Sequence, residues 1–279
     1  MNSSGRASQP SADSVTAGCL CNDLPFVCCG RGPQTIVVFP HIRDCLEGVT
    51  RSAWSRRWLK RFGKNGHRVY IIGRRKHLSP ACTTADMARD YARAIEKHIG
   101  PAHIMGFSLG GLIAQHVAAG HPHCVISLVL AVSAHRTCPS QLEGLHRWIS
   151  LAENRDWQNI YLDIASLMHT GITQDMRETV LPFLGRALRR HPPSPADFIA
   201  LVRASLKHDA TAVLPAIRAR TLIIGGTRDR LFPVSIFREA AGLIPLATLR
   251  LMDGAGHGAF DERKREFDRA VLEFWGPSR

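Results

Sequence analysis

Gly106-Phe107-Ser108-Leu109-Gly110 joins a run of apolar residues at 102–107 to a helical pattern that begins at Leu109. A strand that turns directly into a helix needs small residues at the turn, because side chains there would collide. Glycines two positions before and after Ser108 meet this need and leave the serine hydroxyl exposed on a tight, strained turn. The stretch therefore predicts a strand, a sharp turn and a helix, with Ser108 as a candidate nucleophile.

Two residues further along the chain have the chemistry that a serine nucleophile requires. A serine hydroxyl needs an imidazole to accept its proton, and the imidazole needs a carboxylate to orient it and stabilise its charged form. Asp229 follows a buried apolar run at 221–224, and His257 follows the last apolar run of the chain. We predict that Asp229 is the orienting acid and His257 the general base. Asp253 is the alternative acid, although Asp253-Gly254 is a turn signal.

Apolar runs alternate with helical patterns along most of the chain. Nearly continuous apolar strands that alternate with helices indicate a parallel sheet covered on both faces, and so an α/β fold. Between Gln141 and Ala210 the pattern is only helical, which indicates a helical insertion. The predicted strands are 35–39, 68–72, 102–107, 124–132, 221–224 and 247–251.

From about Asp23 to Phe274 the chain resembles the α/β-hydrolase superfamily, in its serine hydrolase or esterase form with a helical lid. The resemblance implies a mostly parallel sheet flanked by helices, with an all-helical cap inserted after the sixth strand. It divides the rest of the chain into a hydrolase core at 23–140 and 211–279 and a cap at 141–210, while the composition of the N-terminus predicts a disordered tail at 1–22. It also implies the roles given above to Ser108, Asp229 and His257.

The resemblance is weakest at the loop that completes the oxyanion hole. The family usually has His-Gly after its third strand, whereas this chain has Pro40-His41 followed by Ile42 and Arg43. We expect the backbone N–H groups of Leu109 and Ile42 to hold the oxyanion, with Arg43 as the alternative to Ile42. His41 is interpreted as a structural histidine. Arg74-Arg75-Lys76 is interpreted as exposed loop charge.

The expected activity is cleavage of an ester, thioester or lactone of a small, largely apolar substrate, without cofactor or metal. C–C bond hydrolysis, aminopeptidase activity and acyl transfer would use the same triad and stay open, as does a non-catalytic small-molecule receptor on the same fold. The apolar stripes of the cap predict a substrate pocket near Trp148, Trp157 or Phe183. No HExxH or similar metal-ligand spacing is present.

The number and distribution of charged residues indicate whether the chain binds nucleic acid. The chain has 279 residues and a formal net charge of +13, but its arginines are spread along the whole length. In the densest basic stretch, Arg51–Lys76, the residues Trp54, Trp58 and Phe62 form an apolar helix stripe, which favours a core helix with a solvated basic face over a nucleic-acid patch.

Apolar runs and cysteine usage bear on the cellular setting. No apolar run approaches the roughly 20 residues that cross a bilayer, and residues 1–15 lack the apolar segment of a secretory signal. The eight cysteines show no CxxC pair, so we interpret them as free thiols. We predict a cytoplasmic protein that binds a small molecule and neither nucleic acid nor membrane. The oligomeric state stays open.

Overall fold

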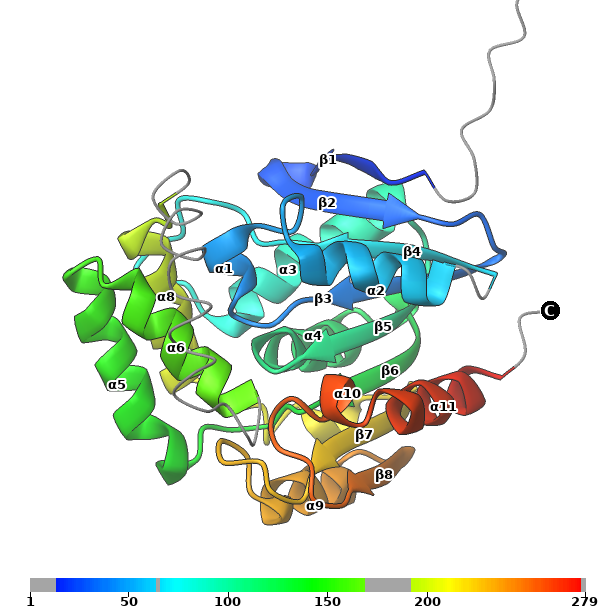
Figure 1. Ribbon diagram of the computed structural model, residues 1–279. Helices are drawn as coiled ribbons and strands as arrows, with labels where there is room; N and C mark the ends of the chain where they lie inside the picture. Colours follow the sequence, from blue (N-terminus) through cyan, green and yellow to red (C-terminus); the bar gives the residue numbers. More distant parts are fainter. Residues whose placement is uncertain (1–13, 64–65, 169–191, 277–279) are drawn as a thin grey trace, which may run out of the picture.

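The computed structural model describes residues 14–63, 66–168 and 192–276, which form a sheet with helices on both faces and a group of helices at one end (Figure 1). Within these residues the sheet has eight strands in the spatial order β1-β2-β4-β3-β5-β6-β7-β8. β1 and β2 run antiparallel to their neighbours, and the other six strands are mutually parallel. The strands are β1 Thr16–Leu20, β2 Leu24–Cys29, β3 Gln34–Phe39, β4 His67–Ile72, β5 Ala102–Phe107, β6 Val125–Ala131, β7 Arg220–Gly226 and β8 Ala247–Met252.

The six parallel strands are the six that the sequence predicts, and the mostly parallel α/β architecture is confirmed. Helices α2 and α11 lie on one face of the sheet and meet through aromatic contacts, and α3 packs against α4 on the other face. The α-helices are α1 Asp44–Glu47, α2 Ala53–Gly63, α3 Thr84–His98, α4 Leu109–Gly120, α5 Pro139–Glu153, α6 Trp157–Met168, α8 Pro195–Leu206, α9 Val234–Leu243, α10 Ala259–Glu262 and α11 Lys264–Trp275. Helices α10 and α11 are separated at Arg263.

The basic helix α2 packs into the core as its apolar stripe predicts. Trp54, Trp58 and Phe62 are all buried, whereas Arg56, Arg57 and Lys60 are exposed. The Trp58 ring lies 4.7 Å from Phe107, the residue before Ser108, and 5.8 Å from Phe267 of α11. This aromatic packing fixes the end of β5 that carries the turn at 106–110, which we call the elbow.

Regular structure begins earlier in the chain than the sequence predicted. The expected disordered segment at 1–22 is wrong for its second half, because Thr16–Leu20 forms the edge strand β1 and pairs with β2. Residues 1–13 lie outside the described part of the chain. Edge strands are held by backbone hydrogen bonds and tolerate polar, exposed side chains. The amino-acid composition of this segment therefore gave no indication of a strand.

The helical insertion lies between β6 and β7, where the sequence predicted it. Its described helices are α5, α6 and α8, which we call the cap, and they stand at the end of the sheet to which the parallel strands point (Figure 1). Two segments connect the cap to the sheet and pair with each other: the Thr137 N–H donates to the His208 carbonyl (3.1 Å) and the Ala210 N–H to the His135 carbonyl (2.7 Å). We call these segments, 135–137 and 208–210, the neck. No described helix has the length and apolar character needed to span a membrane.

Candidate active site

Ser108 sits on a strained turn between β5 and α4. Its φ is +49° and its ψ −117°, a conformation that residues with side chains rarely adopt. The two flanking positions are glycine because there is no room for a side chain. A Cβ on Gly106 would lie 2.6 Å from the Gly110 carbonyl oxygen, and one on Gly110 would lie 2.0 Å from the Phe39 carbonyl oxygen. Only glycine lets β5, α4 and the end of β3 approach this closely.

Ser108, His257 and Asp229 form one hydrogen-bonded chain. The Ser108 Oγ lies 3.1 Å from His257 Nε2, and His257 Nδ1 lies 2.9 Å from Asp229 Oδ2. Asp229 and His257 are buried. A carboxylate can only accept, so Asp229 selects the tautomer with the proton on Nδ1 and leaves Nε2 to accept from the hydroxyl.

The loop after β7 holds the Asp229 carboxylate in place. Asp229 Oδ1 accepts backbone N–H groups from Leu231 (2.8 Å) and Phe232 (3.0 Å), which leaves Oδ2 for the imidazole. The rival acid, Asp253, is exposed and accepts the Thr227 hydroxyl at 3.1 Å. It makes no hydrogen bond with His257, so the geometry favours Asp229.

Two backbone N–H groups beside Ser108 have no hydrogen-bond acceptor among the described residues. Within the part of the chain that the structure describes, neither Leu109 nor Ile42 donates its N–H to a protein acceptor. The Arg43 N–H, by contrast, donates to His41 Nδ1 at 3.2 Å. Both Leu109 and Ile42 line the cavity described below. The arrangement therefore favours Ile42 over Arg43 as the partner of Leu109.

His41 takes the place of the expected glycine without backbone strain, because its φ is not positive. Its ring packs against Trp54 at 4.8 Å, and its Nε2 has no hydrogen-bond partner among the described residues. Burial, followed by the nearby charges of Arg43 and Arg74, lowers the pKa of His41 well below its ordinary value. His41 is therefore neutral at neutral pH, and it also lines the cavity.

The interpretation of Arg74 as exposed loop charge is wrong. Its guanidinium is buried, donates to the carbonyls of Pro40 and His41 (3.2 Å for the latter), and lies 3.5 Å from the Asp44 carboxylate. Arg74 thereby holds the loop that carries Ile42. A charge after a strand usually faces solvent, whereas this one is buried in contact with residues 40–44.

A cavity of about 250 Å³ opens beside Ser108, between the sheet and the cap. Trp148 lines it, as predicted. Trp157 instead packs against Phe198 with ring centroids 5.8 Å apart, and Phe183 lies outside the described residues. Most of the wall is apolar, from Ile42, Leu109, Leu112, Leu145, Trp148, Ile164, Leu167, Met168, Leu231 and Phe232.

Three charged residues also line the cavity, and two of them have ion-pair partners. Arg136 pairs with Glu239 at 2.8 Å, and Asp163 pairs with Arg147 at 2.8 Å. Arg230 forms no ion pair with any residue that the structure describes. It is available to an anionic group of a ligand. The described wall contains no cluster of three metal ligands.

The sequence comparisons agree with this geometry. A model of the alpha/beta hydrolase family matches residues 37–270, from β3 into α11. The chain belongs to the alpha/beta hydrolase family. The match contains the elbow, the cap and the loops after β7 and β8.

Relatives within the alpha/beta hydrolases differ in substrate. A 2-hydroxy-6-oxononadienedioate/2-hydroxy-6-oxononatrienedioate hydrolase from Burkholderia vietnamiensis is 31% identical over 88% of this chain and 88% of its own. A pimeloyl-[acyl-carrier protein] methyl ester esterase from Chromobacterium violaceum is 28% identical over 62% of this chain and 69% of its own. The crystal structure of an alpha/beta hydrolase enzyme from a Medee basin deep-sea metagenome library has a TM-score of 0.73 and 20% identity, with 92% of this chain and 96% of that chain covered. This last likeness concerns the fold.

Proposed function

We propose that the protein is a serine hydrolase that cleaves an ester, thioester or lactone of a small, largely apolar substrate through an acyl-enzyme on Ser108. The observation that carries the proposal is the continuous chain from the Ser108 hydroxyl through His257 to the buried Asp229, at the wall of an apolar cavity. The esterase relative supports ester chemistry. The cavity volume suits a short acyl group.

In the proposed reaction, Ser108 Oγ attacks the substrate carbonyl carbon while His257 Nε2 takes the hydroxyl proton. The carbonyl oxygen becomes an oxyanion held by the Leu109 and Ile42 N–H groups. His257 then gives the proton to the leaving alcohol or thiol, and the acyl group stays on Ser108. A water molecule, deprotonated by His257, attacks the acyl-enzyme and releases the acid. Asp229 stabilises the imidazolium at each transfer.

The test combines a fluorophosphonate label with p-nitrophenyl esters of increasing acyl length. We expect the label on Ser108, turnover that favours short acyl chains, and a loss in kcat of about a thousandfold or more in Ser108→Ala. Ser166→Ala is the matched control, because Ser166 lines the same cavity but donates its hydroxyl to the Asp163 carbonyl. Undiminished labelling of Ser108→Ala would refute the assignment.

A second candidate is hydrolysis of a C–C bond in a dicarboxylate, which uses the same triad. The unpaired cation Arg230 at the cavity favours it, and the Burkholderia relative is named for dioate substrates. Arg230→Met should then raise KM for a 2-hydroxy-6-oxo-dienedioate, whereas Arg228→Met, at an exposed position outside the cavity wall, should not. Equal turnover of neutral esters in both variants, with no dioate turnover in the wild type, would leave ester hydrolysis as the function.

A further inference from the structure

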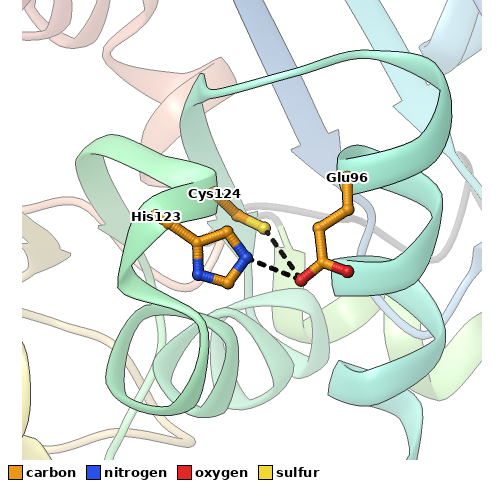
Figure 2. Close-up of side chains that lie close together, drawn as sticks. All are labelled: Glu96, His123 and Cys124. Atoms are coloured by element: carbon orange, nitrogen blue, oxygen red, sulfur yellow. Dashed lines mark hydrogen bonds and ion pairs between the residues drawn. The ribbon is translucent and has the colours of Figure 1, made fainter.

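A group of metal-ligating side chains lies at the opposite end of the sheet from Ser108. Glu96 is on the last turn of α3, and His123 and Cys124 are on the 3-10 helix Pro122–Cys124 that leads into β6. Their side chains point toward one another from two separate segments (Figure 2). Ser108 follows the carboxyl end of β5, whereas Cys124 precedes the amino end of the neighbouring parallel strand. The group is therefore remote from the candidate active site.

One carboxylate oxygen is the centre of the group. Glu96 Oε1 lies 2.7 Å from His123 Nε2 and 3.8 Å from Cys124 Sγ. His121 Nδ1 approaches the same oxygen at 3.4 Å. The Cys124 thiol also lies 3.8 Å from the Ala92 carbonyl oxygen. Two imidazole nitrogens from the exposed side and the sulfur of the buried Cys124 thus approach the same carboxylate oxygen.

Small rotations of these side chains would give the separations of a tetrahedral metal site. Zinc binds nitrogen and oxygen at about 2.0–2.2 Å and sulfur at about 2.3 Å, so neighbouring ligand atoms in a tetrahedron lie about 3.3–3.7 Å apart. The ligand atoms of Glu96, His123 and Cys124 lie within 4.8 Å of one another. Glu96 and His123 are exposed, so rotation of their side chains can open space for the ion.

We propose that Glu96, His123 and Cys124 bind a zinc-class divalent transition metal ion, with His121 or a water molecule in the fourth position. Thiolate and imidazole ligands select zinc-class ions over magnesium or calcium. On binding, the Cys124 thiol releases its proton to solvent and its sulfur donates an electron pair to the ion. The Glu96 carboxylate and the thiolate then neutralise the two positive charges of the ion.

The expected role of the ion is structural. It would join the end of α3 to the connection between α4 and β6, which are held together here by the exposed pair of Glu96 and His123. Because the group is remote from Ser108, esterase turnover should not depend on the ion. Failure of this proposal is thus distinguishable from failure of the proposed function.

The test is a titration of the untagged full chain with Co²⁺ alone. We expect one equivalent to give the near-ultraviolet thiolate-to-cobalt charge-transfer absorption, and Zn²⁺ to displace it. Cys124→Ser should abolish the absorption, and Glu96→Gln and His123→Ala should weaken affinity by at least about tenfold, a loss seen even for outer-shell partners of metal sites. His121→Ala weakens binding if His121 is the fourth ligand and leaves it unchanged if water is.

Cys21→Ser is the matched control, because Cys21 Sγ and His98 Nε2 lie 3.0 Å apart and no third metal ligand joins them among the residues that the structure describes. It should keep the absorption. A second measurement compares the unfolding temperature of each protein with and without Zn²⁺. The ion should raise this temperature for the wild type and for Cys21→Ser but not for Cys124→Ser. No absorption in the wild type, or the same absorption in Cys124→Ser, would overturn the proposal.

Discussion

At the scale of single residues, the Ser108 elbow depends on close packing around a strained backbone. Such a conformation costs about 1–3 kcal/mol and persists only where the surroundings enforce it. The surroundings here are the Gly110 approach to the Phe39 carbonyl and the aromatic packing of Phe107. The strain points the hydroxyl toward His257 rather than into the helix.

Asp229 is predicted to be the acid on which His257 depends. Asp229→Asn should lower kcat by about a thousandfold or more, because an amide can donate to Nδ1 and so selects the wrong tautomer. Asp253→Asn is the matched control and should keep kcat within about tenfold, since Asn also suits the turn at Gly254. Steady-state kinetics on one short-chain ester compare the two. The opposite order of losses would move the triad to Asp253.

Arg74 is predicted to stabilise the loop that carries Ile42. Arg74→Met leaves Asp44 as a buried carboxylate without its cation, which costs about 3–5 kcal/mol. The double variant Arg74→Met, Asp44→Asn should recover part of this loss, because no uncompensated charge is left. Urea unfolding of the three proteins measures it. Equal stability of the single and double variants would contradict the role of the ion pair.

The contrast between Ser108 and Arg74 shows which residues the sequence could predict. The elbow, Asp229 and His257 each follow an apolar run, so their places at strand ends are written in local patterns. Arg74 also follows a strand, but its burial depends on a loop that begins 34 positions earlier at Pro40. Glu96 and His123 are 27 positions apart in the sequence, and their contact likewise depends on the tertiary fold. Local patterns carry no signal for such contacts.

At the scale of elements, helix α6 of the cap ends directly against the loop of His257. A Cβ on Gly258 would lie 1.8 Å from the Met168 carbonyl oxygen. The last turn of α6 and the loop after β8 thus pack backbone to backbone. Met168 also lines the cavity. The position of α6 is therefore coupled to the residue next to His257.

Gly258→Ala is predicted to displace the end of α6 and to lower both stability and turnover. The Gly258 φ is −85°, so the effect comes from the contact and not from backbone strain. Gly242→Ala in α9 is the matched control, because a Cβ there meets nothing within 4 Å. It should raise stability by about 0.5–1 kcal/mol. Thermal unfolding and ester kinetics test both variants. An unchanged unfolding temperature and turnover for Gly258→Ala would contradict the coupling between α6 and the loop of His257.

The parallel strands and the cap helices were predictable because each buries its own apolar pattern. The antiparallel pair β1 and β2 was not. No residue of Thr16–Leu20 is buried, and Pro25 interrupts the run in β2. Their pairing is a property of two backbones that meet, with Gly18 opposite Phe26.

At the scale of the whole molecule, the neck contains buried histidines that link stability to pH. His208 accepts or donates a hydrogen bond with Thr84 (2.9 Å) and lies against the His116 ring, 5.4 Å away. Burial, with the nearby His116 and His135 opposed by Asp209, lowers the pKa of His208 to about 3. Burial also lowers the pKa of His135. Neither ring is protonated in the folded chain near neutral pH.

The protein is therefore predicted to lose stability as pH falls from about 6.5 toward 3. In this window the unfolded chain binds a proton at His208 and the folded chain does not. The loss is up to about 1.4 kcal/mol per pH unit, or about 2 kcal/mol between pH 7 and pH 5. His208→Gln, which keeps a partner for Thr84, should flatten the decline, and His146→Gln at an exposed position should not. Urea unfolding at pH 7 and pH 5 measures the free energy of unfolding of the wild type and the two variants. Equal losses in all three proteins would contradict the prediction.

The paired segments of the neck also bear on how the molecule can be redesigned. The two points where the chain leaves and rejoins the sheet face each other across the Arg136 to Asp209 bridge. A replacement segment grafted between them can start and finish at adjacent positions, and its length matters little because loop closure depends weakly on length. It must also supply the contact that the end of α6 makes with Gly258. The sheet is thus a scaffold on which foreign caps that keep this contact can be exchanged while Ser108 stays in place.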